Sequence, residues 1–343
     1  MAPTIHIIDP DPDTVIVLKN PCKIFAPWDP EEERRNPTMS EVPYSDEHPQ
    51  PSTSRPHQEP ALVETPADSS MYTLDEGSTA LTEPSSAVQR TPSPDLPEEP
   101  EEESIHYHVS SRHLILASVA FKRMLAQNGF AESVRNEADG LYHITAHDWD
   151  AEAFLIVLRI VHGRNKQVPR EVSLEMLAKI AVLEDYYNFE EALDVFTEVW
   201  ILELTKRPIP QMHCRDLVLW VWIAWVFDIE QQFTKATATS IRQITESFRT
   251  LDLPIPAIVS DEIDARRYLA IESLLEGLQE RLEMYRRTDY TCLCDSHMSF
   301  QCGSYLLGSL MKELCRLGLD QPRPEIPFRD LSFSALCGQP YMI

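Results

Sequence analysis

The chain of 343 residues is strongly acidic, with 55 Asp and Glu residues against 30 Lys and Arg and a formal charge of −25. Because there is no surplus of basic side chains to neutralise phosphates, this composition argues against direct binding of nucleic acid. The length is enough for one or two domains with a sizeable core.

The cysteines and the N-terminal residues predict an intracellular protein of the nucleus or cytoplasm. Seven cysteines, an odd number in a long chain, favour reduced thiols. The sequence MAPTIHIIDPDPD has neither the basic nor the apolar stretch of a secretory signal. The most apolar run, Leu217 to Phe227, is eleven residues long, whereas a membrane span needs about 20. We therefore expect a buried helix there and no membrane contact.

The first predicted element is a strand over residues 13–19, a β-branched run between Asp–Pro and Asn–Pro pairs. The composition then changes. Between Trp28 and Ser104 there are 19 Asp and Glu residues against 4 Lys and Arg, and 14 prolines fall between Pro27 and Pro100. Such a stretch cannot bury enough apolar surface to offset its chain entropy, so we expect disorder. Thr91 and Ser93, each followed by proline, are its candidate phosphorylation sites.

Regular structure is predicted again from residue 105. An alternating strand covers 105–109, and Ser110 with Ser111 can cap a helix whose apolar positions continue to Leu125. A third strand is expected over 140–145.

Three further helices follow. Asp150 is suited to begin the first, and Gly163 is suited to end it. The second carries Leu174, Leu177 and Ala181 on one face. Asn188 and Glu191 resemble a capping box before the third, whose apolar positions are Leu193, Phe196, Trp200 and Leu204.

All patterned segments beyond Pro208 predict helices. We expect them over about 213–227, 230–249, 261–287 and 303–317. The tail, 321–343, is expected to be extended and to pack back on these helices.

In chain order these elements resemble those of a known family. The residues that carry the resemblance are 13–18 (DTVIVL), 107–117 (YHVSSRHLILA), 121–125 (FKRML, similar to the family's second helix), 148–163 and 174–187. On these segments, residues 13–25 and 105–204 resemble a BTB/POZ domain in the form found in many filamentous-fungal proteins.

The resemblance implies an α+β fold, with a small mixed sheet flanked by helices and followed by an all-α C-terminal region. The expected parts are the first-strand region 1–27, the disordered insertion 28–104, the rest of the BTB/POZ domain 105–207, a helical extension 208–320 and the tail 321–343. The family joins its first two strands by a tight hairpin. An insertion of about 80 residues is tolerable there, because loop-closure entropy grows only by about 0.6 kcal/mol per doubling of length.

For function, the resemblance implies a non-enzymatic adaptor without a cofactor, which binds protein partners. BTB domains form homodimers through the first helix and first strand, which makes Leu114, Ile115 and the positions from Ala117 to Phe121 candidate contact residues. Because the insertion adjoins that strand, a monomer is the alternative. A hydrophobic–x–Glu element at Phe130 and Glu132 resembles the one that contacts cullin-type ubiquitin-ligase scaffolds, so such a scaffold is the second candidate partner.

Three groups of residues suggest other functions. Ser110, Ser111 and His113 suggest a nucleophile and a base, but no glycine-rich nucleophile turn is present, and helix capping explains them better. The tryptophans Trp220, Trp222 and Trp225 are better explained by core packing than by a ligand pocket. Cys292, Cys294, His297 and Cys302 are candidate zinc ligands. We predict no metal there, because C-x-C is an uncommon ligand spacing and buried unliganded thiols are common.

Overall fold

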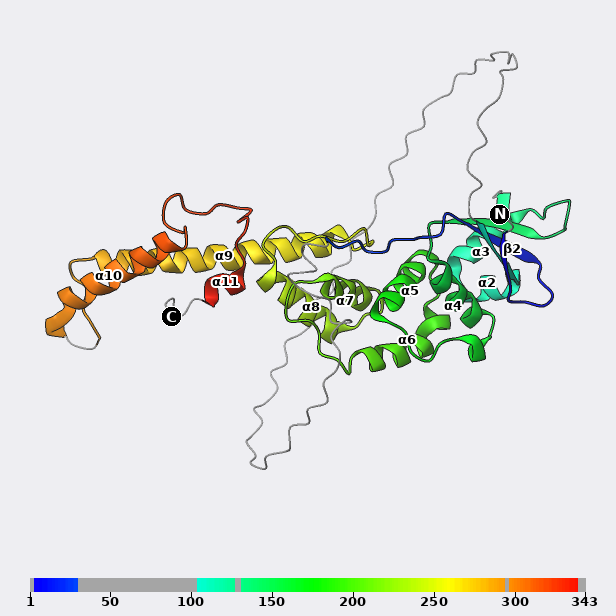
Figure 1. Ribbon diagram of the computed structural model, residues 1–343, viewed down its shortest axis with the longest axis horizontal. Helices are drawn as coiled ribbons and strands as arrows, with labels where there is room; N and C mark the ends of the chain where they lie inside the picture. Colours follow the sequence, from blue (N-terminus) through cyan, green and yellow to red (C-terminus); the bar gives the residue numbers. More distant parts are fainter. Residues whose placement is uncertain (1–2, 30–103, 127–130, 294–295, 339–343) are drawn as a thin grey trace, which may run out of the picture. The chain divides into compact units, whose positions relative to one another are not determined.

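The computed structural model describes residues 3–29, 104–126, 131–293 and 296–338. Nearly all of the predicted insertion, including Thr91 and Ser93, lies outside these residues, as do Phe130 and Cys294. The described chain is mixed α+β, with a small mixed sheet and a helical C-terminal region (Figure 1).

The sheet has four strands in the order β1-β3-β2-β4. They are β1 (Thr4–Ile7), β2 (Thr14–Lys19), β3 (Ser104–Val109) and β4 (Tyr142–His147). β2 runs antiparallel to β3, with Thr14 opposite Val109, and parallel to β4. β1 pairs with β3 in parallel. The strands predicted over 13–19, 105–109 and 140–145 are confirmed to within two residues, whereas β1 was not predicted.

Five helices follow in the first half of the described chain. They are α2 (Ser111–Ala117), α3 (Val119–Leu125), α4 (Ala151–Val161), α5 (Leu174–Tyr187) and α6 (Glu190–Leu204). The start of α4 is as predicted, because the Asp150 carboxylate accepts hydrogen bonds from the main-chain N–H groups of Glu152 and Ala153. Its end is also as predicted, with Gly163 in the left-handed region at φ +66°.

The predicted capping box at Asn188 and Glu191 is wrong. Asn188 takes the left-handed conformation that ends α5, with φ 55°, and α6 begins after Phe189. The carboxylate that accepts a hydrogen bond at this end of α6 belongs to Glu184 of α5, whose Oε2 lies 2.9 Å from the Phe189 nitrogen.

The C-terminal helices are α7 (Arg215–Val226), α8 (Glu230–Gln243), α9 (Ala257–Arg286), α10 (Ser299–Arg316) and α11 (Phe333–Cys337). Most of α7 is buried, as the apolar run predicted. The tail differs from the prediction, since residues 333–337 are helical and not extended. Ser332 begins α11 by accepting a hydrogen bond from the Ala335 nitrogen. α11 packs on α8 and α9, which agrees with the prediction that the tail packs back on the helices.

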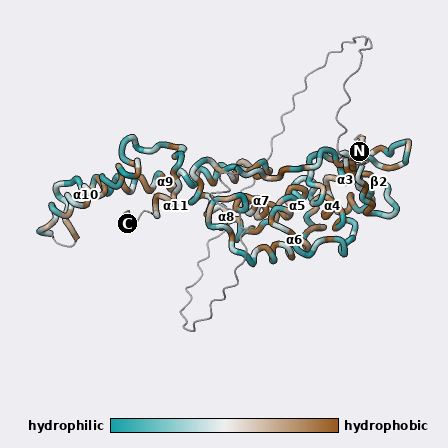
Figure 2. Tube along the Cα trace, viewed as in Figure 1, coloured by the Kyte–Doolittle hydropathy of each residue, from teal (hydrophilic) through white to brown (hydrophobic). Residues whose placement is uncertain are grey.

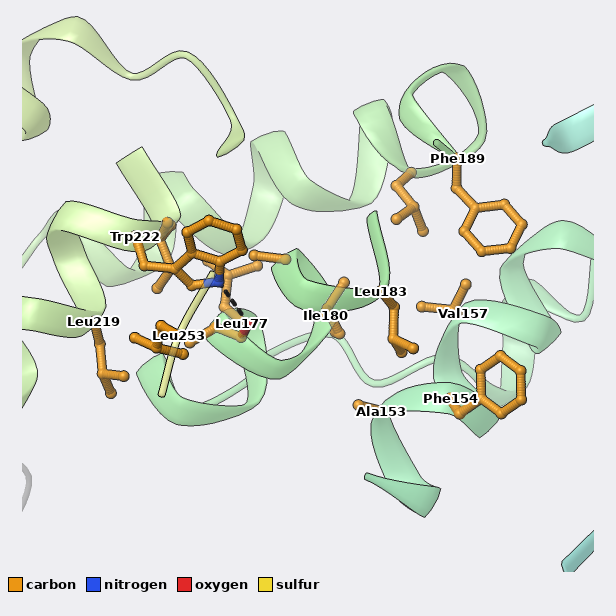
Figure 3. Packing of buried hydrophobic residues seen from close by; sticks show 14 of the residues in the cluster. Ala153, Phe154, Val157, Leu177, Ile180, Leu183, Phe189, Leu219, Trp222 and Leu253 are labelled. Carbon is orange, nitrogen blue, oxygen red and sulfur yellow. Dashed lines mark hydrogen bonds between the residues drawn. The ribbon is translucent and has the colours of Figure 1, made fainter. Parts of the chain in front are cut away.

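One apolar core spans residues on both sides of the boundary expected at 207/208. It extends from Ile8 to Ile263, and α5 lies at its centre, in contact with α3, α4, α6 and α7. Figure 3 shows Leu177, Ile180 and Leu183 of α5 between side chains of α4 and α7. Trp222 of α7 packs here with its indole N–H donated to the Ala178 carbonyl. Hydrophobic segments gather around α4, α5 and α7 in Figure 2.

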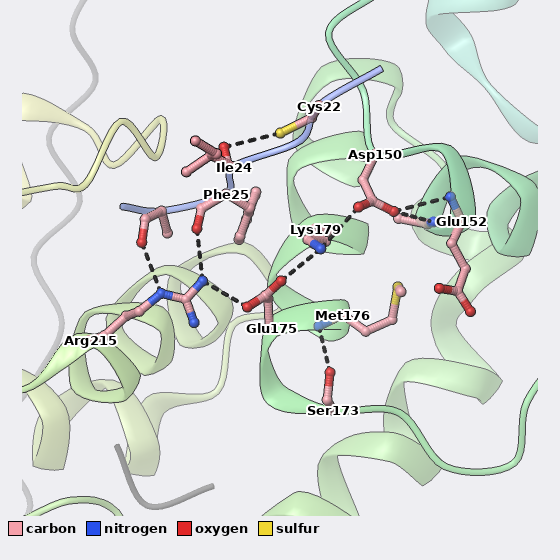
Figure 4. Close-up of polar contacts among 12 residues, drawn as sticks. Cys22, Ile24, Phe25, Asp150, Glu152, Ser173, Glu175, Met176, Lys179 and Arg215 are labelled. Carbon is pink, nitrogen blue, oxygen red and sulfur yellow. Dashed lines mark hydrogen bonds and ion pairs between the residues drawn. The ribbon is translucent and has the colours of Figure 1, made fainter. Parts of the chain in front are cut away.

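A chain of charged groups links α5 to the helices beside it (Figure 4). Lys179 Nζ lies 2.9 Å from Asp150 and 2.7 Å from Glu175. The other Glu175 oxygen accepts from Arg215 of α7 at 2.8 Å, and Arg215 also donates to the carbonyls of Phe25 and Ala26. Burial alone would lower the pKa of Lys179, but the hydrogen bonds that it donates to Glu175 and Asp150 raise the pKa above its ordinary value.

The C-terminal part depends on one buried guanidinium. Arg267 of α9 is fully buried and donates to five main-chain carbonyls, those of Ile244, Thr245, Pro327, Phe328 and Leu331. The first two follow α8, and the others belong to the tail. A single side chain therefore holds α9, the end of α8 and the segment before α11 together.

We expect Arg267→Met to lower the unfolding free energy by about 3 kcal/mol, because several buried carbonyls would lose their donor. Urea denaturation measures the loss. The control is Arg266→Met, since Arg266 is exposed and pairs only along its own helix with Glu262, and a change within about 0.5 kcal/mol is expected. Equal losses in both variants would contradict the anchoring role of Arg267.

Candidate functional site

The apolar pattern predicted one helix from Ser110 to Leu125, whereas the family resemblance implied a second helix at 121–125. The segment is divided at Ser118, where α2 ends and α3 begins. The Ser118 N–H donates to the Leu114 carbonyl at 3.0 Å, and its Oγ accepts from the Phe121 nitrogen at 3.1 Å. The same hydroxyl donates to the Tyr187 carbonyl at the end of α5, at 2.5 Å. Ser118 therefore ends one helix, caps the next and binds both to α5.

The candidate contact residues at this junction differ in exposure. Leu114 and Phe121 are completely buried in the chain's own core, where Phe121 stacks on Tyr187. Ile115 is half-buried. The apolar side chains that reach the surface here are Leu116 and Val119. Leu114 and Phe121 thus have no surface to offer a partner in this structure, and the self-association itself stays a prediction.

The strand expected to take part in self-association is an inner strand of the sheet and not an edge strand. β2, the predicted first strand, is paired on both sides by β3 and β4, so its main-chain groups are already used. The strand at the sheet edge beside β3 is β1, with Ile5 and Ile7 exposed. A short alternating run before Asp9-Pro10 was the sequence signal for β1.

The serine and histidine side chains near α2 serve the start of that helix. The Asp13 carboxylate accepts from the Ser111 nitrogen at 2.6 Å and from its hydroxyl at 2.5 Å. Burial raises the pKa of Asp13, but the hydrogen bonds from Ser111 outweigh it, so the pKa lies below its ordinary value.

His162 is held by main-chain groups at both ring nitrogens. Nε2 accepts from the Ser110 nitrogen at 2.9 Å, and Nδ1 donates to the Leu158 carbonyl at 2.8 Å. Burial lowers the pKa of His162, and His113, 5.0 Å away between ring centroids, lowers it further. The neutral ring therefore positions the start of α2. With both nitrogens occupied, it is not placed to take a proton from Ser111.

The residues of the other two predicted sites are only partly described. Glu132 is half-buried on the short 3₁₀ turn Ala131–Ser133, and Phe130 lies outside the described residues, so the cullin contact stays a prediction. Among the described residues no three His, Cys, Asp or Glu side chains are placed to hold a metal ion. Cys292, His297 and Cys302 are described, whereas Cys294 is not, and the absence of zinc there stays a prediction.

A cavity of about 280 Å³ lies between the segment before α5, the end of α6 and α7. Charged groups of both signs line it, namely Glu171, Glu203, Arg207 and Asp216, together with the ring of Trp220. Sequence reasoning missed it because its residues come from separate elements. Its volume is just below the range of small-molecule sites, roughly 300–1,000 Å³.

The core-packing prediction is confirmed for Trp220 and Trp222, which are buried, whereas Trp225 is partly exposed.

No helix in the described ranges is both long and apolar enough to cross a bilayer. No protein-family model, curated protein or solved structure matches the chain.

Among the described residues, Glu184 is a buried carboxyl group whose ionisation affects stability near neutral pH. Burial, together with the charges of Glu190 and Asp185, raises its pKa to about 7 against the hydrogen bond from the Phe189 nitrogen. Because the folded chain binds this proton more tightly than the unfolded chain, the contribution to stability is full below the ordinary glutamate pKa. It is lost as the pH rises toward 7.

We therefore expect Glu184→Gln to be more stable than the wild type at about pH 8, by on the order of 3 kcal/mol, with the difference shrinking toward about pH 5. The amide oxygen can still accept from Phe189, so the hydrogen bond is kept. Urea denaturation at these pH values measures the effect, with Glu191→Gln on the exposed face of α6 as the control. Parallel pH profiles for Glu184→Gln and the wild type would show that Glu184 ionises normally.

Proposed function

We propose that the chain is a non-enzymatic protein–protein interaction module of the BTB/POZ type, which self-associates through the junction of α2 and α3 and the edge strand β1. The order of elements from β2 to α6, which is strand, strand, helix, helix, strand and three helices, supports the resemblance. The hydrogen bonds from Ser110 to His162 and from Ser111 to Asp13 support a structural role for the two serines that suggested catalysis.

The observation that carries the proposal is the exposure of Leu116 (86%) and Val119 (50%) on either side of the buried Ser118. Single exposed apolar residues are common and need no explanation. Here two lie three positions apart at the junction of α2 and α3, and BTB domains self-associate through the first helix and first strand. The edge strand β1 adds Ile7, which is 72% exposed. Self-association through these elements would cover exposed apolar area.

The test is the molar mass of the full chain by light scattering after gel filtration. We expect twice the chain mass of 39.3 kDa for the wild type, and the monomer mass for the double variant Leu116→Asp/Val119→Asp, because buried carboxylates would oppose the contact. The matched control is Ile258→Asp/Leu269→Asp, which changes two residues of α9 that are 73% and 70% exposed.

The control should remain a dimer. A wild-type mass of one chain would exclude self-association, and a dimer that persists in Leu116→Asp/Val119→Asp would move the interface away from the α2–α3 junction.

A further inference from the structure

The outer face of α6 carries an apolar row that packing among the described residues does not cover. Leu193 and Trp200 face inward, toward α4 and α5, on which α6 packs. On the other side, Val195, Val199 and Leu202 are 67%, 51% and 62% exposed. Their spacing of i, i+4 and i+7 places them on one stripe of the helix. Figure 1 shows α6 next to α4 and α5, at the margin of this group of helices.

An acidic row runs beside the apolar one. Glu191, Asp194 and Glu198 are exposed and spaced i, i+3 and i+7, so they follow the same helix direction along one flank of the apolar stripe. From Glu190 to Leu204 the helix has acidic residues and no Lys or Arg. Glu203 lies on the other flank and pairs with Lys206. The surface therefore joins apolar contact area to a negative field.

The signs of the charges decide what can occupy this surface. The segment between Trp28 and Ser104 has 19 acidic and 4 basic residues, so the acidic row would repel it. A second copy of α6 would bring the same acidic row to a two-fold contact, where like charges oppose association. The occupant that fits is a different molecule with apolar and positively charged groups side by side.

We propose that the outer face of α6 binds an amphipathic helix of another protein. Apolar side chains of that helix at i, i+3 or i+4, and i+7 contact Val195, Val199 and Leu202, and Lys or Arg side chains on one flank pair with the acidic row. This surface is separate from the α2–α3 junction, so the proposal holds whether or not the chain self-associates.

The two rows have different roles in binding. Exposed ion pairs contribute only about 0–1 kcal/mol each, so the acidic row mainly sets orientation and speeds encounter, and its effect weakens with salt. The three apolar side chains supply the contact that excludes water. Loss of either row should therefore weaken binding, whereas only loss of the acidic row should reduce its salt dependence.

The experiment measures binding of a defined probe to the full chain by fluorescence anisotropy. The probe is a fluorescein-labelled, amide-capped helical peptide of about 14 residues, with Leu at i, i+3, i+4 and i+7 and Lys elsewhere. A second peptide with Glu in place of every Lys reports the charge requirement. Titrations are made at about 50 and about 150 mM salt.

Two α6 variants are compared with two matched controls. Val199→Ser/Leu202→Ser removes apolar contact, and its control Ile258→Ser/Leu269→Ser makes the same change at exposed positions of α9. Glu191→Gln/Asp194→Asn/Glu198→Gln removes three charges. Its control removes the same number from exposed positions of α9 by Asp261→Asn/Glu276→Gln/Glu280→Gln. Circular dichroism checks that each variant is folded.

We expect saturable binding of the Lys peptide to the wild type, at least about tenfold weaker binding for both α6 variants, unchanged binding for both controls and none for the Glu peptide. Equal weakening in the α6 charge variant and its α9 control would show unspecific attraction to an acidic protein and overturn the proposal. Absence of saturable binding to the wild type would overturn it as well. Since Leu116→Asp/Val119→Asp leaves α6 intact, its binding should match the wild type, which separates this test from that of self-association.

Discussion

The guanidinium of Arg215 joins the parts of the molecule that the chain itself keeps far apart. It donates to the carbonyls of Phe25 and Ala26, which follow the central strand, and to Glu175 at the start of α5. Through Lys179 the same chain of charges reaches Asp150, the residue that begins α4. Lys179, Asp150 and Arg215 are largely shielded from water, so each charge depends on the opposite charges beside it. Removal of one side chain would leave a neighbouring charge without one of its partners.

Both candidate surfaces depend on the helix that this network fixes. At the C-terminal end of α5, the Tyr187 carbonyl accepts from Ser118 and so sets the angle between α2 and α3. Three residues earlier, Glu184 accepts from the Phe189 nitrogen and so positions the start of α6. The exposed pair at the α2–α3 junction and the two rows on α6 are therefore presented from the same rigid support, although they face different partners.

Elements with strong local patterns could be predicted from the sequence, and those set by distant contacts could not. The strand 13–19, the helix begun by Asp150 and the buried helix at Leu217 follow from periodicity and capping. No glycine or proline marks the break at Ser118 in the sequence. The break depends on the Tyr187 carbonyl, which is 69 residues away along the chain. Asn188 suits both the start and the end of a helix, and only the reach of Glu184 across the turn decides between them.

Two of the candidate contact residues, Leu114 and Phe121, are core residues for a related reason. α2 and α3 are apolar on the side that packs against α4 and α5 and also at Leu116 and Val119, so the composition alone could not separate core from surface. Only the break between the helices decides which positions point outward. The outer rows of α6 were visible in the sequence as Val195, Val199 and Leu202, but their exposure follows from where α4 and α5 cover the helix.

The strand order also determines when the sheet can form during synthesis. β2 is an inner strand, and its partners begin at Ser104 and Tyr142, so it leaves the ribosome long before either neighbour exists. Until β3 and β4 follow, its apolar run Val15 to Leu18 has no partner strand and is exposed to other nascent chains. The time from the synthesis of β2 to a complete sheet is thus set by the length of the chain between β2 and β4, and the sheet cannot be complete before His147 has been made.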